Sequence, residues 1–111
     1  MLKADIVKEL VTELNRAQLE LSVQINSYID LKRMLSARLN YLITNHFSRL
    51  ISLLYRLDIS EKKLQQLLSL QADMPAGEII TEMIIERQLQ KIEARKMFKN
   101  KADNIPEEER W

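Results

Sequence analysis

The single histidine, His46, is the side chain best suited to acid–base chemistry near neutral pH. A metal site in a helical bundle typically uses Glu-x-x-His, but Ile43 stands three residues before His46. A serine nucleophile would need a Gly-x-Ser-x-Gly turn, which a chain with one glycine cannot form. We therefore interpret His46 as a partly buried helix residue. It either forms a hydrogen bond to a neighbour such as Asn45, or it is a polar residue in a row of leucines that fixes how two helices align.

Other sequence patterns that carry catalysis or cofactors are also missing. The paired carboxylates Glu82 and Glu86 lie on a periodic helix and not in contrasting environments. The sequence has no glycine-rich phosphate loop and no dinucleotide fingerprint, and zero cysteines exclude thiolate metal sites. The sequence predicts a protein that is not an enzyme, with no catalytic, metal or cofactor-binding residues.

A stripe of basic residues is the one charge pattern with a possible ligand. The stripe steps by four residues and comprises Arg87, Lys91, Arg95 and Lys99. Bases near the end of a helix suit its dipole on a solvated face, and this is the favoured interpretation. The alternative is a candidate basic ladder for phosphates or an acidic partner. A net charge of +1 provides no global field for nucleic acid, so nucleic-acid binding is not favoured.

Periodicity and capping residues predict helices over 5–16, 28–57, 61–71 and 76–100. The helix over 28–57 has leucines at helical spacing, with His46 in the one missing position. Ser60 is expected to cap the helix over 61–71. Pro75 is placed to open the helix over 76–100.

The segment 18–25 is ambiguous because apolar and polar residues alternate strictly along it. This period is typical of a half-buried strand, although a helix would also place several apolar residues on one face. Ser27-x-x-Asp30 resembles a capping box, which predicts a break before Ser27 and slightly favours the strand.

Two helices have features that predict contact with another chain. A helix over 28–57 would be roughly 45 Å long, against a diameter of roughly 34 Å for a compact domain of this size. Such a helix either kinks near Thr44-Asn45 or extends beyond its own domain and contacts a partner chain. The helix over 76–100 is apolar on two sides, which indicates either an enclosed position or, slightly preferred, an interface between chains. The candidate dimer interface comprises Ile85, Leu89, Ile92, Leu19, Leu21, Val23 and Ile25.

The predicted fold is all-α: a four-helix bundle-like domain over 1–101 with one long central helix and at most a single short strand at 18–25. Residues 102–111 are expected to form a flexible acidic tail ending in Trp111. The predicted core comprises Leu10, Leu14, Leu35, Leu39, Leu42, Leu50, Leu53, Leu54, Leu57, Leu64, Leu67, Leu68, Ile80 and Met83.

Residues 53–64 (LLYRLDISEKKL) and 83–92 (MIIERQLQKI) resemble segments of short, uncharacterised helical proteins of Bacteroidota-type bacteria. The resemblance covers the C-terminal two-thirds of the chain and brings no activity with it. It implies that Arg56-Leu57-Asp58 and Glu86-Arg87-Gln88 are junction residues, with Arg56 or Arg87 pairing with Asp58 or Glu86.

The function expected from the sequence is a non-catalytic protein-interaction or oligomerisation module, acting as a homodimer and binding another protein. The alternative is a small regulatory nucleic-acid-binding protein that uses a basic helix face, with Asp58-Ile59-Ser60 as the turn of a helix-turn-helix. No run of about 18 apolar residues occurs. We therefore expect a cytoplasmic protein without a membrane partner.

Overall fold

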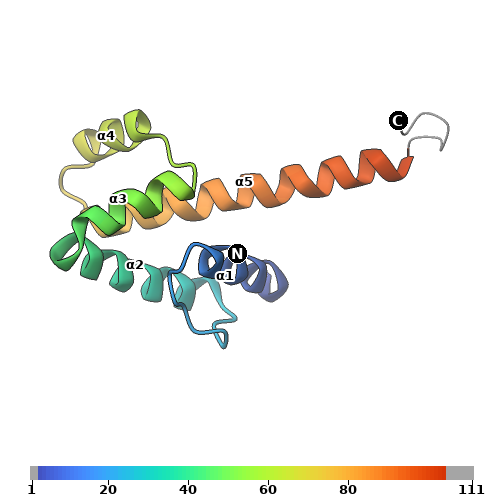
Figure 1. Cartoon of the computed structure of the whole chain (residues 1–111), viewed down its shortest axis with the longest axis horizontal. Helices are drawn as coiled ribbons and strands as arrows, with labels where there is room; N and C mark the ends of the chain where they lie inside the picture. Colours follow the sequence, from blue (N-terminus) through green and yellow to red (C-terminus); the bar gives the residue numbers. More distant parts are fainter. Residues whose placement is uncertain (1–2, 105–111) are drawn as a thin grey trace.

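The structure, a computed structural model, describes residues 3–104, and all regular secondary structure within that range is helical. Five helices follow one another along the chain, as labelled in Figure 1. They are α1 (Ala4–Arg16), α2 (Tyr28–Asn45), α3 (Phe47–Arg56), α4 (Glu61–Leu70) and α5 (Ala76–Asn104). The all-α prediction is confirmed.

Helix α5 is the long central element of the fold. Helix α2 packs along it, and α1 and α4 contact it as well. These neighbours enclose the N-terminal two-thirds of α5, where Ile84 is completely buried and Ile85 and Ile92 are each 2% exposed. Two apolar sides on this helix therefore reflect an enclosed position within one chain, the less favoured of the two interpretations made from the sequence.

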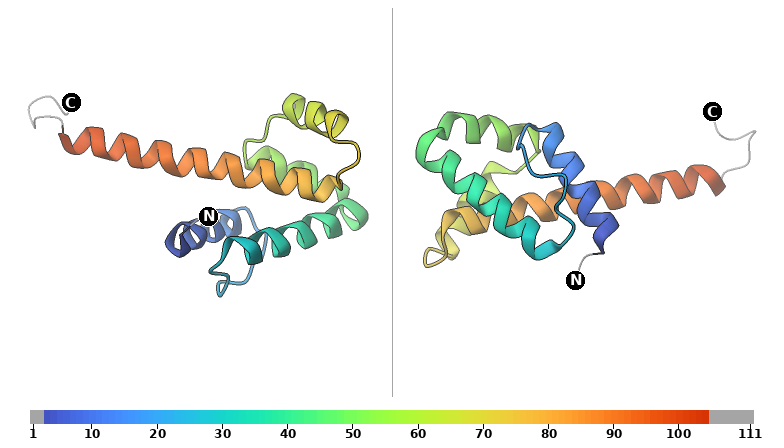
Figure 2. Two further views of the ribbon diagram at one scale, coloured as in Figure 1. Left: turned by 180° about the vertical axis from the view of Figure 1, so that it is seen from behind. Right: turned by 90° about the horizontal axis from the view of Figure 1, so that it is seen from below.

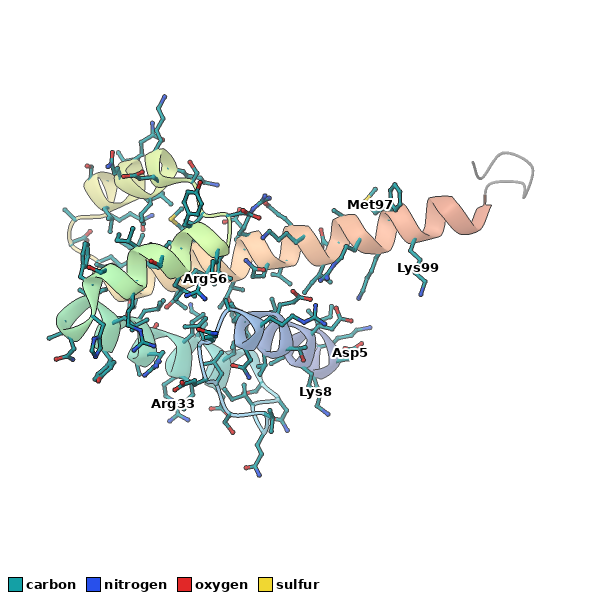
Figure 3. All side chains as sticks on the ribbon, in the orientation of Figure 1. Asp5, Lys8, Arg33, Arg56, Met97 and Lys99 are labelled. Carbon is teal, nitrogen blue, oxygen red and sulfur yellow. The ribbon has the colours of Figure 1, made fainter. Side chains whose placement is uncertain are left out.

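The C-terminal part of α5 extends beyond the other helices in all views (Figure 2). Met97 and Lys99 lie on this extension (Figure 3), and the Met97 side chain is 66% exposed. The helix continues through Asn104, so it includes the first three residues of the expected tail. The remainder of that tail, including Trp111, lies outside the described residues.

The predicted helix over 28–57 is divided at His46. With φ −146° and ψ 58°, His46 ends α2 and begins α3, while its N–H donates to the Leu42 carbonyl at 2.9 Å. The expected kink is confirmed, and an overhanging helix is excluded. His46 is exposed at this break, so the prediction that it is partly buried is wrong. Its Nε2 lies 3.5 Å from the Tyr41 hydroxyl. The Asn45 side chain donates to the Tyr41 carbonyl and not to His46.

Small residues bring α2 and α5 close together. The Ser36 and Thr81 hydroxyls lie 3.0 Å apart across the interface, and the Thr81 hydroxyl donates to the Gly77 carbonyl at 2.7 Å. A Cβ on Gly77 would run into the side chain of Asn40 on α2. A larger residue at position 77 would therefore require the exposed Asn40 side chain to move. Thr81 is buried with its hydroxyl satisfied.

Residues 17–27 form a loop, so both the strand and the helix predicted for 18–25 are wrong. The alternation is retained only in part: Leu19, Leu21 and Ile25 are buried, but Val23, which belongs to the same apolar set, is 80% exposed. The side chain of Asn15 replaces a strand partner: its Oδ1 accepts from the Leu21 N–H at 2.7 Å, and its Nδ2 donates to the Leu21 carbonyl at 3.0 Å. The backbone groups of Leu21 are therefore satisfied without a second strand.

Both serine caps are confirmed. Ser27 Oγ accepts from the Asp30 N–H and Ser60 Oγ from the Lys63 N–H, each at 3.2 Å. Most of the predicted core is also buried, with three exceptions on α4 that are described below.

Candidate functional site

The outer face of α3 carries three exposed apolar side chains at helical spacing. Phe47, Ile51 and Tyr55 follow at intervals of four residues and are 59%, 50% and 86% exposed. The opposite face of the same helix is buried in the core. Single exposed apolar residues are common on protein surfaces, but a row of three large ones is typical of an interaction surface.

Helix α4 lies next to this face without burying any of its own side chains fully. The predicted core positions Leu64, Leu67 and Leu68 are only half-buried, so this part of the core prediction is wrong. The reason is that α4 packs mainly on α5, which covers one side of it. Leu70 at its end is 80% exposed.

Between α3, α4 and α5 lie two adjoining hollows that share Tyr55 and Ile59, and we call them together the α4 groove. The inner hollow has a volume of about 90 Å³, and its lining is mostly apolar. It is formed by Ile51, Leu54, Tyr55, Ile59, Glu61 and Leu64. The outer hollow has a volume of about 590 Å³, and its charged wall residues are Asp58, Lys63, Glu86 and Arg87. An apolar floor with a charged rim is the usual form of a protein-binding surface.

The turn after α3 is held firmly against α5 at the base of this groove. The Leu57 carbonyl accepts from Gln88 Nε2 at 3.2 Å and from Lys91 Nζ at 3.3 Å. The Asp58 carbonyl accepts from Arg87 Nε at 3.3 Å, and the Asp58 carboxylate pairs with Lys91 at 2.7 Å. The two predicted junction segments therefore meet, although the ion pair uses Lys91 and not an arginine.

These contacts also stabilise an unusual backbone conformation. Asp58 has φ 58°, in the left-handed region where aspartate is better tolerated than most residues. The hydrogen bond from Lys91, helped by the charges of Lys91 and Arg87, holds the pKa of the Asp58 carboxyl below its usual value.

The Asp58–Lys91 pair predicts a pH-dependent contribution to stability. Because the native pKa of Asp58 is lowered, its contribution is present above the usual aspartate pKa and is lost as pH falls through the native value. Asp58→Asn should therefore be less stable than wild type at neutral pH, and the difference should shrink in acid. Urea unfolding over a pH series measures this, with Asp73→Asn as the control for removing a surface carboxylate. A difference that stays constant into acid would contradict the role of the pair.

The residues expected at a dimer interface lie mostly in the chain's own core. Five are buried, Leu89 is half-buried, and only Val23 is exposed. The buried five are Leu19, Leu21, Ile25, Ile85 and Ile92. A second chain cannot reach these five without disturbing the fold, and pairing of the segment 19–25 as a strand is wrong because no strand forms there.

The candidate basic ladder is divided among separate contacts. Arg87 and Lys91 hold the turn after α3, and Arg95 pairs with Glu13 of α1 at 3.0 Å. Lys99 lies farther along α5, in the cleft between α5 and α1. The four residues therefore do not present one uniform stripe to a ligand.

Among residues 3–104, no three His, Asp or Glu side chains are grouped as ligands for a metal ion. No helix in the same range is both long and apolar enough to cross a membrane. Comparison of the chain with protein-family models, curated proteins and solved structures finds no match.

Proposed function

We propose that this protein is a non-catalytic interaction module that binds an amphipathic helix of another cytoplasmic protein in the α4 groove. The observation that supports this most is the row of Phe47, Ile51 and Tyr55 beside the apolar inner hollow. Residues four apart on a helix are separated by about 6 Å along its axis. A partner helix with apolar residues one turn apart matches that spacing, as in other helix-in-groove complexes.

The rim gives such a partner an orientation. Lys63 and Arg87 are basic, whereas Glu86 is acidic, and all three line the outer hollow. Rim charges contribute more to specificity and association rate than to affinity. A partner helix with charges of both signs beside its apolar face therefore fits this groove best.

Two matched substitutions test the proposal. Ile51→Asp places a charge in the groove, whereas Ile29→Asp makes the same change at a 63% exposed position on α2. Loss of a buried apolar contact, together with desolvation of the aspartate, should weaken partner binding by at least about tenfold for Ile51→Asp. Quantitative affinity capture from the native cell should retain a specific protein on wild type and on Ile29→Asp but not on Ile51→Asp. Equal recovery on all three proteins would contradict the proposal.

A second copy of the chain is the competing occupant. Sedimentation equilibrium of the purified protein at micromolar concentration distinguishes the two cases. A dimer that dissociates in Ile51→Asp, but not in Ile29→Asp, would place a second copy in the groove and overturn the assignment to a different protein.

A nucleic-acid-binding function is the second candidate, and it rests on the geometry of α3 and α4. Four residues separate these helices, and α4 exposes Lys62, Lys63, Gln65 and Gln66. A recognition helix of a helix-turn-helix reads bases with residues of this kind. Gel-shift titrations at low and moderate salt decide the matter, because phosphate binding weakens steeply with salt. Absence of binding even at low salt would eliminate this candidate.

A further inference from the structure

Four cationic side chains from three helices line one hollow between α1, the end of α3 and α5. Arg16 is the last residue of α1, Arg56 is the last of α3, and Lys91 and Arg95 come from α5. The hollow has a volume of about 450 Å³. Figure 3 shows Arg56 at the end of α3, on the side that faces α1. We call this feature the cation hollow.

Basic residues often end helices because they bond the last carbonyl groups, but here the backbone performs that task. At the end of α3, backbone N–H groups bond the carbonyls of Leu53, Leu54 and Tyr55 at 3.0–3.1 Å. At the end of α1, backbone N–H groups likewise bond the carbonyls of Leu14 and Asn15. Among the described residues, the Arg56 guanidinium has no hydrogen bond and no ion pair. The C-terminal carbonyl groups of α3 are therefore satisfied without an arginine at position 56.

The carboxylates nearby balance only part of this charge. Glu13 Oε1 is shared between Arg16 at 3.3 Å and Arg95 at 3.0 Å. The Asp58 carboxylate pairs with Lys91. Four cations thus face two carboxylates, which leaves an excess of two positive charges around the hollow. Each arginine retains N–H donors beyond those used in these pairs.

We propose that the cation hollow binds a small molecule carrying a phosphate monoester. A phosphate monoester has about two negative charges at neutral pH, which matches the local excess better than a single carboxylate does. A guanidinium group can bind two phosphate oxygens at once, and three arginines line this hollow. The hollow is also far larger than a phosphate group and falls in the range of small-molecule sites, about 300–1,000 Å³. This site is separate from the α4 groove and does not depend on the function proposed for it.

Phenyl phosphate and phenyl sulfate are suitable probes because they share a shape and differ in charge. Titration at constant ionic strength, followed by NMR of backbone amides and arginine side chains, should show saturable binding of phenyl phosphate around Arg56 and Arg95. Phenyl sulfate should bind more weakly. Arg56→Gln should weaken phenyl phosphate binding by about tenfold, the effect of losing one charge-assisted contact. Arg49→Gln, an exposed position on the same helix, should leave the affinity unchanged.

Three outcomes would overturn the proposal. The first is that phenyl phosphate gives no saturable shift at constant ionic strength. The second is equal weakening by Arg49→Gln and Arg56→Gln, because that would reflect the overall charge of the chain and not a site. The third is tighter binding of a phosphoserine peptide than of phenyl phosphate, which would assign the hollow to a phosphorylated protein in place of a small ligand.

Discussion

Replacing Leu53 with alanine is expected to lower the free energy of unfolding by about 2–5 kcal/mol, the cost of removing a large side chain from a packed core. Leu53 lies on the inner face of α3 and is only 3% exposed. The loss combines the transfer free energy of the removed atoms with that of the cavity they leave. Urea unfolding followed by circular dichroism measures it.

The matched control is Leu67→Ala on α4. Leu67 is only half-buried, so the loss should stay below about 1 kcal/mol. Similar losses for the two variants would show that α4 belongs to the core after all. A loss below about 0.5 kcal/mol for Leu53→Ala, the usual value for an exposed site, would remove Leu53 from the core.

Asn15→Ala is expected to be the most destabilising polar substitution, with a loss of about 2–3 kcal/mol. The side chain makes two hydrogen bonds to the backbone of Leu21, at 2.7 and 3.0 Å, and they fix a loop whose Leu19, Leu21 and Ile25 fill the core. Alanine would leave the N–H and the carbonyl of Leu21 without partners in a partly buried place. The same urea unfolding measurement applies.

Asn26→Ala provides the comparison in the same loop. Asn26 is exposed, so its replacement should change stability by less than about 0.5 kcal/mol. Equal effects at the two asparagines would mean that the bonds from Asn15 do not hold the loop. Increased amide exchange at Leu21 in Asn15→Ala alone would support the assigned role.

Helix positions and helix starts could be predicted from the sequence because they depend on near neighbours. Apolar residues three and four apart define a buried face, and a serine oxygen reaches an N–H three residues along the chain. For this reason the all-α class and the caps at Ser27 and Ser60 are confirmed. The alternation over 19–25 also identified three inward-facing side chains, Leu19, Leu21 and Ile25, but it placed the exposed Val23 with them.

The partners of those faces depended on contacts that no local pattern contains. Asn15 satisfies the backbone of Leu21 from six residues away, so an apparent strand is a loop. The two apolar sides of α5 were compatible with either a dimer or enclosure, and only its central position among α1, α2 and α4 distinguishes them. The leucines of α4 have core spacing, but too few helices surround them to bury them.

The candidate sites were likewise predictable from the sequence only within a single helix. The sequence indicated that Arg87, Lys91 and Arg95 share a stripe, since they lie on one helix at regular spacing. It could not indicate that Arg16 and Arg56 join two of them around one hollow, because those residues come from different helices. Helical periodicity determines which side of an element is apolar or charged. Only the packing of distant segments decides whether that side meets the core, another charge or open solvent.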